Sequence, residues 1–344
     1  MRDAFKPEFL PIEVGSLPHI DPEEACNLIL THFSEVSAWP QLPKRTFLEN
    51  MYVQFSEGFP GIVLERERIY VDRAQDLSAE LQRLYLAYLE NDLEMYAVSP
   101  AYAAGLAQWS RGEFKSCRAV KGQVTGPISW GLSVVDEEGR PVLYDEVLAD
   151  AVAKHLRLKA AWQERELRQL HATTMIFLDE PYMTSFGSAY VAVTREQAIA
   201  LIEEVLDGLE GLKGVHCCGN TDWSLILATS IDILSFDTYD YAESLSLYPA
   251  EVESFLRRGG IIVWGIVPRE GEKLARETTA SLVERLHQAM ELLVRKGISF
   301  DDLLAASLVS PVCGLGSISL NWAERALALT AGVSKEMRKR YLSP

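Results

Sequence analysis

Short apolar runs that end in polar turns, each followed by a helical pattern, recur along the whole chain. Runs such as 175–178, 212–215 and 305–309 are too short for helices and are bounded by turn residues, which is typical of buried strands. Eight candidate strands end near the following positions: Gly15, Leu42, Val124, Leu178, Cys218, Phe236, Val267 and Val312.

The segments between these runs carry clear signals for helices. Asp21, followed by a proline and two acidic residues, predicts a helix that begins at residue 22. Thr194 and Gln197 have the spacing of a capping box, and an apolar stripe follows them. A second stripe over 282–293 ends before Gly297, which predicts a left-handed residue after the helix.

Eight strand–helix units in one chain predict an α/β fold, a (β/α)8 TIM barrel, with residues 1–344 forming one domain. Two segments exceed the minimal unit and predict extra helices, one set within 46–110 after strand 2 and one within 142–171 after strand 3. The alternative is an open doubly wound sheet. Its Gly-x-Gly-x-x-Gly fingerprint is absent, because Gly15 is followed by Ser-Leu-Pro.

Composition and charge narrow the functional class. The 344 residues are 48% apolar, and 33 basic against 49 acidic side chains give a net charge of −16. So acidic a chain repels phosphate backbones, which argues against nucleic-acid binding. No run reaches the roughly 18 apolar residues of a membrane span. The polar start and five irregularly spaced cysteines predict a cytoplasmic protein without disulfides.

Histidine and cysteine residues stand at the ends of two of the predicted strands. Side chains alternate along a strand, so His216 and Cys218 share a face while Cys217 points the other way. Cys313 closes another strand and is followed by Gly-Leu-Gly. Imidazole and thiolate ligands suit Zn²⁺, and three protein ligands would leave a position for a substrate. The alternative is a buried strand that carries inert cysteines.

Three further strand ends carry polar candidates. Asp179 ends a very apolar run and could hold a substrate ammonium group or a proton, or could cap the next segment. Asp237 could be a further metal ligand, a helix cap or a solvated loop residue. Gln123 begins a Gln-Val-Thr-Gly-Pro turn that is typical of a substrate-lining loop, although turn chemistry alone would explain its Gly-Pro pair.

Five motifs together resemble a known family. In their order along the chain they are similar to those of the C-terminal catalytic barrel of cobalamin-independent methionine synthase, within the uroporphyrinogen decarboxylase-like superfamily. The resemblance extends from about residue 12 to about residue 332. The motifs are Val-Gly-Ser-Leu-Pro at 14–18, Gly-Gln-Val-Thr-Gly-Pro at 122–127, Phe-Leu-Asp-Glu-Pro at 177–181, His-Cys-Cys at 216–218 and Pro-Val-Cys-Gly-Leu at 311–315.

The resemblance implies a zinc-dependent transfer of a methyl group to the thiol of homocysteine, giving methionine. It implies that the zinc ligands are His216, Cys218, Cys313 and Asp237, the last at a position where the family usually has glutamate. It also implies that homocysteine binds at the turn of Gly15 and Ser16, with its amino group on Asp179 and Gln123 in the lining. Zinc would deprotonate the acceptor thiol, whose pKa is otherwise near 8.5.

Two departures from the family pattern leave the methyl donor open. The full-length family carries a second, N-terminal barrel, and its catalytic barrel has a histidine soon after strand seven, where this chain reads Ile-Val-Pro-Arg-Glu over 266–270. The donor is therefore either methylfolate or a methylated corrinoid protein. The sequence also leaves room for a corrinoid-linked enzyme with another thiol acceptor, a metal-independent decarboxylase of the porphyrinogen type, and a barrel that only binds zinc or a thiol.

Overall fold

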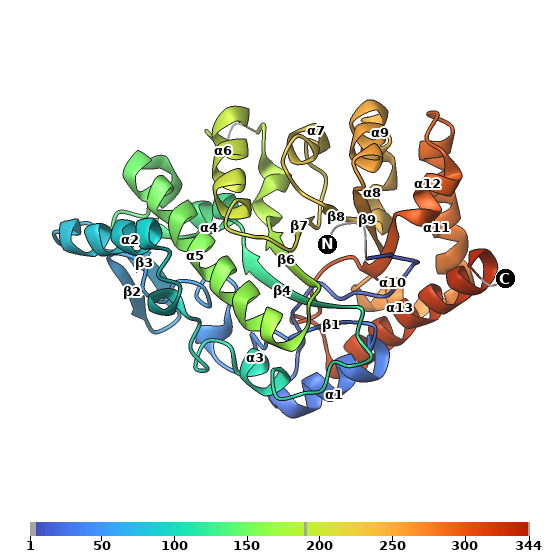
Figure 1. Cartoon of the computed structure of the whole chain (residues 1–344), viewed down its shortest axis with the longest axis horizontal. Helices are drawn as coiled ribbons and strands as arrows, with labels where there is room; N and C mark the ends of the chain where they lie inside the picture. The colour runs from blue at the N-terminus through green and yellow to red at the C-terminus, as the bar shows by residue number, and fades with distance from the viewer. Residues whose placement is uncertain (1–4, 189–190, 343–344) are drawn as a thin grey trace.

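The computed structural model describes residues 5–188 and 191–342, and a curled sheet of seven parallel strands lies at its centre. Helices pack along the outside of this sheet (Figure 1). The strand order is β1-β4-β6-β7-β8-β9-β10. The strands are β1 (Val36–Ala38), β4 (Ala119–Thr125), β6 (Thr174–Asp179), β7 (Leu212–Cys217), β8 (Ile233–Asp237), β9 (Ile261–Val267) and β10 (Ser307–Pro311).

The eighth strand expected near Gly15 is an irregular segment among the described residues. Isolated parallel bridges join Pro11 to Val309 of β10 and Ser16 to Gln41, just past β1. Val309 accepts a hydrogen bond from Ile12 and donates one to Leu10, but Phe9 has a left-handed φ of 54°, so the extended conformation does not continue before this bridge. The segment nevertheless joins the two edges of the sheet, because it pairs with β10 at one edge and with Gln41, which follows β1, at the other.

The helices begin and end largely where the sequence predicts. Asp21 caps α1, Thr194 and Gln197 form a capping box on α6, and Gly297 has a φ of 98°. Helices α1 and α13, from opposite ends of the chain, pack against each other (Figure 1). The helices that alternate with the strands are α1 (Pro22–His32), α4 (Pro127–Ser133), α5 (Glu146–Leu170), α6 (Arg195–Leu206), α7 (Trp223–Leu227), α8 (Thr238–Leu245), α9 (Pro249–Arg257), α10 (Gly271–Arg276), α11 (Thr279–Val294), α12 (Phe300–Ala305) and α13 (Leu320–Tyr341).

The long segments after β1 and β4 contain further elements. Helical segments occur where extra helices were predicted. The same region also contains a small sheet of order β2-β3-β5, which was not predicted. These elements are η2 (Phe47–Glu49), β2 (Ile62–Glu65), β3 (Arg68–Val71), α2 (Ser78–Glu90), η3 (Glu94–Tyr96), α3 (Ala104–Trp109), β5 (Val135–Asp136) and η4 (Val142–Tyr144), and η5 (Pro181–Ser185) follows β6. Over the described residues, no helix combines the length and apolar character needed to cross a bilayer.

Alternation along the strands divides the interior of the sheet into an apolar and a polar part. One apolar cluster is built from side chains near the strand beginnings, including Ala119, Met175, Leu212 and Ile233. The residues two and four positions further on each strand share their face and are largely polar. Asp179, His216 and Ser235 lie directly opposite one another on β6, β7 and β8, and Lys121 and Gln123 belong to this set on β4. The polar groups thus gather toward the carboxyl ends of the strands, where barrel enzymes place their active sites.

Candidate metal centre and substrate cavity

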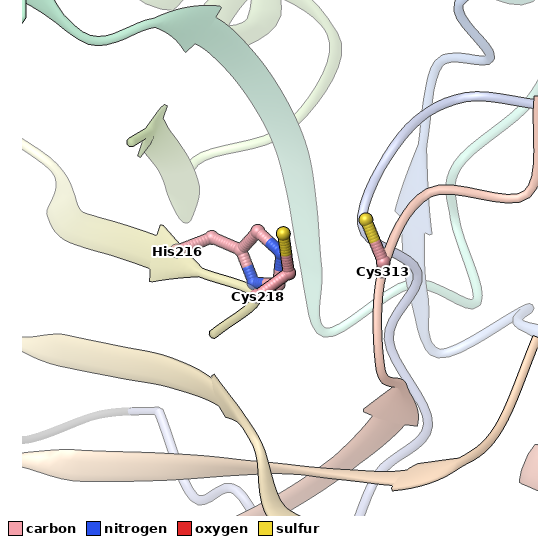
Figure 2. Close-up of side chains that lie close together, drawn as sticks. All are labelled: His216, Cys218 and Cys313. Carbon is pink, nitrogen blue, oxygen red and sulfur yellow. The ribbon is translucent and has the colours of Figure 1, made fainter. Parts of the chain in front are cut away.

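His216, Cys218 and Cys313 come together at the carboxyl end of the sheet, as the sequence predicted. Their possible ligand atoms, one from each residue, lie within 4.8 Å of one another. Figure 2 shows His216 and Cys218 at the end of β7 and Cys313 on the separate segment that follows β10. Residues nearly a hundred positions apart in the chain thus form one group of imidazole and thiol ligands.

Local structure explains why these side chains converge. Cys217 points away from the cluster into the buried core, where its Sγ lies 3.7 Å from the carbonyl oxygen of Gly219. On the other segment, a Cβ at Gly314 would lie 2.3 Å from Oγ of Ser16. Only glycine therefore lets the chain after Cys313 approach the turn at Ser16 so closely.

The imidazole of His216 is buried and held by one of its two nitrogens. Nδ1 lies 2.9 Å from Oγ of Ser235, the residue directly opposite on β8. Nε2 is buried and has no hydrogen-bond partner among the described residues. A buried polar atom without a partner costs free energy, whereas a histidine that binds a metal through one nitrogen usually engages the other in a hydrogen bond. The arrangement fits a metal ligand.

The two thiols interact with each other. A hydrogen bond from Cys313 holds the pKa of Cys218 below its usual value, and the positive charge of Arg269 acts in the same direction. The pKa of Cys313 is raised, first by this same hydrogen bond and then by burial. The hydrogen bond between the two sulfur atoms therefore favours loss of the proton from Cys218 before Cys313. A cation that accepts two sulfur ligands would favour the deprotonated form of both.

A cavity of about 380 Å³ opens beside the cluster. Its lining includes all three cluster residues together with Ser16 and Asp179, two of the predicted substrate-binding residues. The volume lies within the range of sites for small molecules. The remaining lining comes from the N-terminal segment, the loop after β1 and the turns after β6, β9 and β10: Val14, Gln41, Pro43, Lys44, Glu49, Asn50, Met51, Pro181, Arg269, Gly314, Gly316 and Ser317.

Asp179 presents an unpaired carboxylate oxygen beside this cluster. The side chain is buried, and its Oδ1 has no hydrogen-bond partner among the described residues. Burial raises the pKa of Asp179 to about 6, against the opposing effects of His216 and Lys121. Near neutral pH the group is thus mostly a carboxylate that can accept a charged hydrogen bond from a ligand.

Gly15 and Gln123 lie behind the cavity wall. Gly15 has a φ of 152°, and a Cβ there would come within 2.9 Å of the Gln123 side chain. The amide of Gln123 is engaged by the protein, since Oε1 accepts from Lys121 and Nε2 donates to the carbonyl of Trp39. Gln123 is absent from the cavity lining and supports the Gly15 turn from below. Its predicted contact with substrate stays a prediction.

Asp237 does not belong to the cluster that the structure brings together. Its Oδ1 accepts a hydrogen bond of 2.9 Å from the backbone N–H of Asp240, so the carboxylate caps α8. Burial raises its pKa to about 6. Of the roles open to this residue in the sequence, the described geometry contains the helix cap, and its role as a metal ligand stays a prediction.

Several residues near the site carried no recognisable signal in the sequence. Glu49, Asn50 and Met51 line the cavity from the end of η2 and the turn that follows it, a short segment without hydrophobic periodicity. Glu180, next to Asp179, instead accepts hydrogen bonds from the backbone N–H groups of Ile128 and Ser129 at the start of α4. A buried carboxylate at a helix N-terminus is a structural anchor.

Comparisons with known proteins identify solved structures that have the same fold. No protein-family model matches the chain, and no curated protein matches it. Among solved structures, a B12-independent methionine synthase from Shewanella sp. W3-18-1 in complex with selenomethionine aligns with a TM-score of 0.59 and 17% identity, over 97% of this chain and 99% of that one. A putative vitamin-B12 independent methionine synthase from Listeria monocytogenes aligns with a TM-score of 0.54 and 15% identity, over 92% and 85%. The chain therefore shares its fold with structures of the family that its five motifs resemble.

Proposed function

We propose that the chain is a zinc-dependent methyltransferase that transfers a methyl group to the thiol of homocysteine and forms methionine. The observation that carries the proposal is the convergence of His216, Cys218 and Cys313 beside a cavity that also exposes Asp179. Zinc, when bound, supplies Lewis acidity that converts the acceptor thiol into a reactive thiolate near neutral pH. The fold shared with two B12-independent methionine synthase structures supports the same conclusion.

The residues around the cluster fit an amino-acid thiol. The unpaired Oδ1 of Asp179 would accept a hydrogen bond from the ammonium group. Lys44 and Arg269 line the same cavity and would offset the negative charge of a carboxylate. The turn at Gly15 and Ser16 would set the depth at which the sulfur reaches the cluster. In the reaction, a bond forms between this sulfur and the methyl carbon while the bond between the methyl group and its donor breaks.

The donor is methylfolate or a methylated corrinoid protein, and both remain within the proposal. A corrinoid-linked enzyme with a different thiol acceptor would use the same cluster, but it would not need the ammonium partner Asp179. A metal-independent decarboxylase would not require an imidazole and two thiols that converge as metal ligands. A protein that only stores or senses zinc would bind the metal and transfer no methyl group.

Metal content and methyl transfer, measured on the same set of variants, test the proposal. We expect wild type to hold about one zinc per chain and His216→Ala and Cys313→Ser to lose most of it. Cys217→Ser is the matched control, because this thiol lies on the same strand but points into the core. Methyl transfer to homocysteine should follow zinc content, and assays with methyltetrahydrofolate and methylcobalamin distinguish the donors. Zinc retained at full occupancy without Cys313 would refute the proposed site. Zinc binding without methyl transfer to homocysteine from either donor would refute the proposed reaction and leave a binding protein or an enzyme with another acceptor thiol.

A further inference from the structure

A second, much smaller cavity lies inside the sheet, beneath His216. Its volume is about 10 Å³, at the lower limit of the ~10–15 Å³ that one water molecule requires. It is lined by His216 and by four other polar side chains that come from different parts of the sheet interior: Glu13, Lys121, Ser235 and Ser310. The remaining lining is apolar. So many polar groups around so small a space indicate a built site.

Glu13 is the residue that this site leaves unsatisfied. Its side chain is only 3% exposed, and Oε1 is buried without a hydrogen-bond partner among the described residues. Leaving a buried polar group unpaired costs about 1–3 kcal/mol, and more for a charged one. Lys121 lies nearby, but its Nζ donates to the carbonyl of Val14 at 2.7 Å and to Oε1 of Gln123 at 2.9 Å. An ammonium group has three N–H donors, so one is left over.

The serine hydroxyls complete the set of partners. Ser310 donates its proton to the carbonyl of Pro311 at 2.8 Å, so its oxygen can only accept from the cavity side. Oγ of Ser235 forms a hydrogen bond with Nδ1 of His216. A water molecule in the cavity could donate to Glu13 and Ser310 and accept from Ser235 and Lys121, which would satisfy all four of its hydrogen bonds.

The direction of the Ser235 hydroxyl decides which nitrogen of His216 carries the proton. If Ser235 donates to Nδ1, the ring proton is on Nε2 and this nitrogen cannot bind a cation. If Ser235 donates toward the cavity instead, its oxygen accepts from Nδ1–H and Nε2 keeps a free lone pair. An acceptor in the cavity therefore selects the tautomer that can bind metal.

We propose that this cavity binds one water molecule, which links Glu13 to Ser235 and thereby fixes His216 in the tautomer whose Nε2 is free to bind metal. Glu13 and Ser235 are thus positioning residues that act through His216. The inference rests on the proposed role of His216 as a metal ligand, but the tautomer and the water can be observed without any metal.

Three variants test this relay, which runs from Glu13 through the water and Ser235 to His216. Zinc affinity is measured by chelator competition, and the ring nitrogens of His216 are observed by ¹⁵N NMR. Glu13→Leu and Ser235→Ala should each weaken zinc binding about 10–100-fold and populate the Nε2–H tautomer in the metal-free protein. Glu13→Gln retains an acceptor oxygen and should stay close to wild type. The double variant Glu13→Leu/Ser235→Ala should be no weaker than either single variant, because both break one relay.

Stability separates this role from a purely structural one. Glu13→Leu also removes a charge partner of the buried Lys121, so its urea unfolding is measured beside its zinc affinity, and we expect weaker zinc binding in protein that is still fully folded. Ser307→Ala is the matched control, a buried serine of β10 whose Oγ accepts from Trp264 outside the relay. It should lose stability and keep its zinc affinity.

A crystal structure of the zinc-loaded protein should show one ordered water within hydrogen-bond distance of Glu13 and Ser235. A dry cavity, or unchanged affinity and tautomer in Glu13→Leu and Ser235→Ala, would overturn the inference while leaving the metal site intact. If wild type binds no zinc, the proposed function fails, and the NMR tautomer and the water then decide the relay on their own.

Discussion

Asp179 and His216 occupy paired positions on β6 and β7, so a carboxylate and an imidazole face the same interior space side by side. Each keeps one buried atom without a hydrogen-bond partner, Oδ1 and Nε2. An unpaired carboxylate oxygen beside an imidazole nitrogen that is free to bind metal suits a substrate that carries both a cationic group and a metal-binding sulfur. This pairing leads to a prediction that separates substrate binding by Asp179 from metal binding by His216.

Asp179→Asn should weaken the binding of homocysteine without loss of zinc. Removing a charged hydrogen bond of about 1.5–3 kcal/mol corresponds to a roughly 10–100-fold increase in KM. The matched substrate is the desamino analogue 4-mercaptobutanoate, which lacks the ammonium group and should bind wild type and variant alike. Equal losses for both thiols would show that Asp179 does not bind the amino group.

Gly314→Ala should disturb the approach of the Cys313 segment to the turn at Ser16. The new Cβ would lie 2.3 Å from Oγ of Ser16, and relieving such overpacking costs about 1–3 kcal/mol. We expect a lower free energy of unfolding by urea denaturation and a weaker zinc affinity. Adding Ser16→Ala removes the clashing oxygen and should restore most of the stability. A single variant as stable as wild type would mean that the two segments are not held at this distance.

The pH dependence of stability should contain a contribution from His155, a buried residue of α5 that does not line the cavity. Burial lowers the pKa of His155 to about 3, and its Nε2 contacts the carbonyl of Phe55 at 2.6 Å. The unfolded chain takes up this proton near pH 6.5, so the unfolded state binds more protons between pH 6.5 and 3. Stability from this group is therefore complete above pH 6.5 and falls by about 1.4 kcal/mol per pH unit below it.

His155→Gln keeps a donor for Phe55 but cannot take up a proton in this range. Urea unfolding of wild type and variant at pH 7, 5.5 and 4.5 isolates the contribution, because the carboxylates are the same in both. We expect the stability difference between them to shift in favour of the variant as the pH falls. A difference that is constant across these pH values would show that His155 is protonated in the folded protein.

The sequence predicted those parts of the structure that follow from local periodicity. Alternation placed His216 and Cys218 on one face, and the capping residue Asp21 set the start of α1. The predictions were less accurate where prolines interrupt the ladder. The strand expected to end near Leu42 is β1, which stops at Ala38, two residues before Pro40.

The rest of the site depends on contacts between distant segments, which no local pattern encodes. Asp237 satisfies the pattern of a ligand and of a cap, and only the fold shows that it accepts a hydrogen bond from the backbone N–H of Asp240 as a cap. Glu13 is one acidic residue in an irregular segment, and only the fold shows that Lys121 and Ser235 surround it. The loop with Glu49 reaches the cavity through tertiary packing that a single sequence does not reveal.

Zinc K-edge X-ray absorption of the loaded protein observes the proposed ligands and the acceptor thiol together. Two sulfur ligands at about 2.3 Å and at least one nitrogen at about 2.0–2.1 Å should surround the metal. Adding homocysteine should raise the sulfur count from two to three, because the acceptor thiol joins Cys218 and Cys313. A spectrum with fewer than two sulfur ligands, or a sulfur count that homocysteine leaves unchanged, would contradict the proposed chemistry.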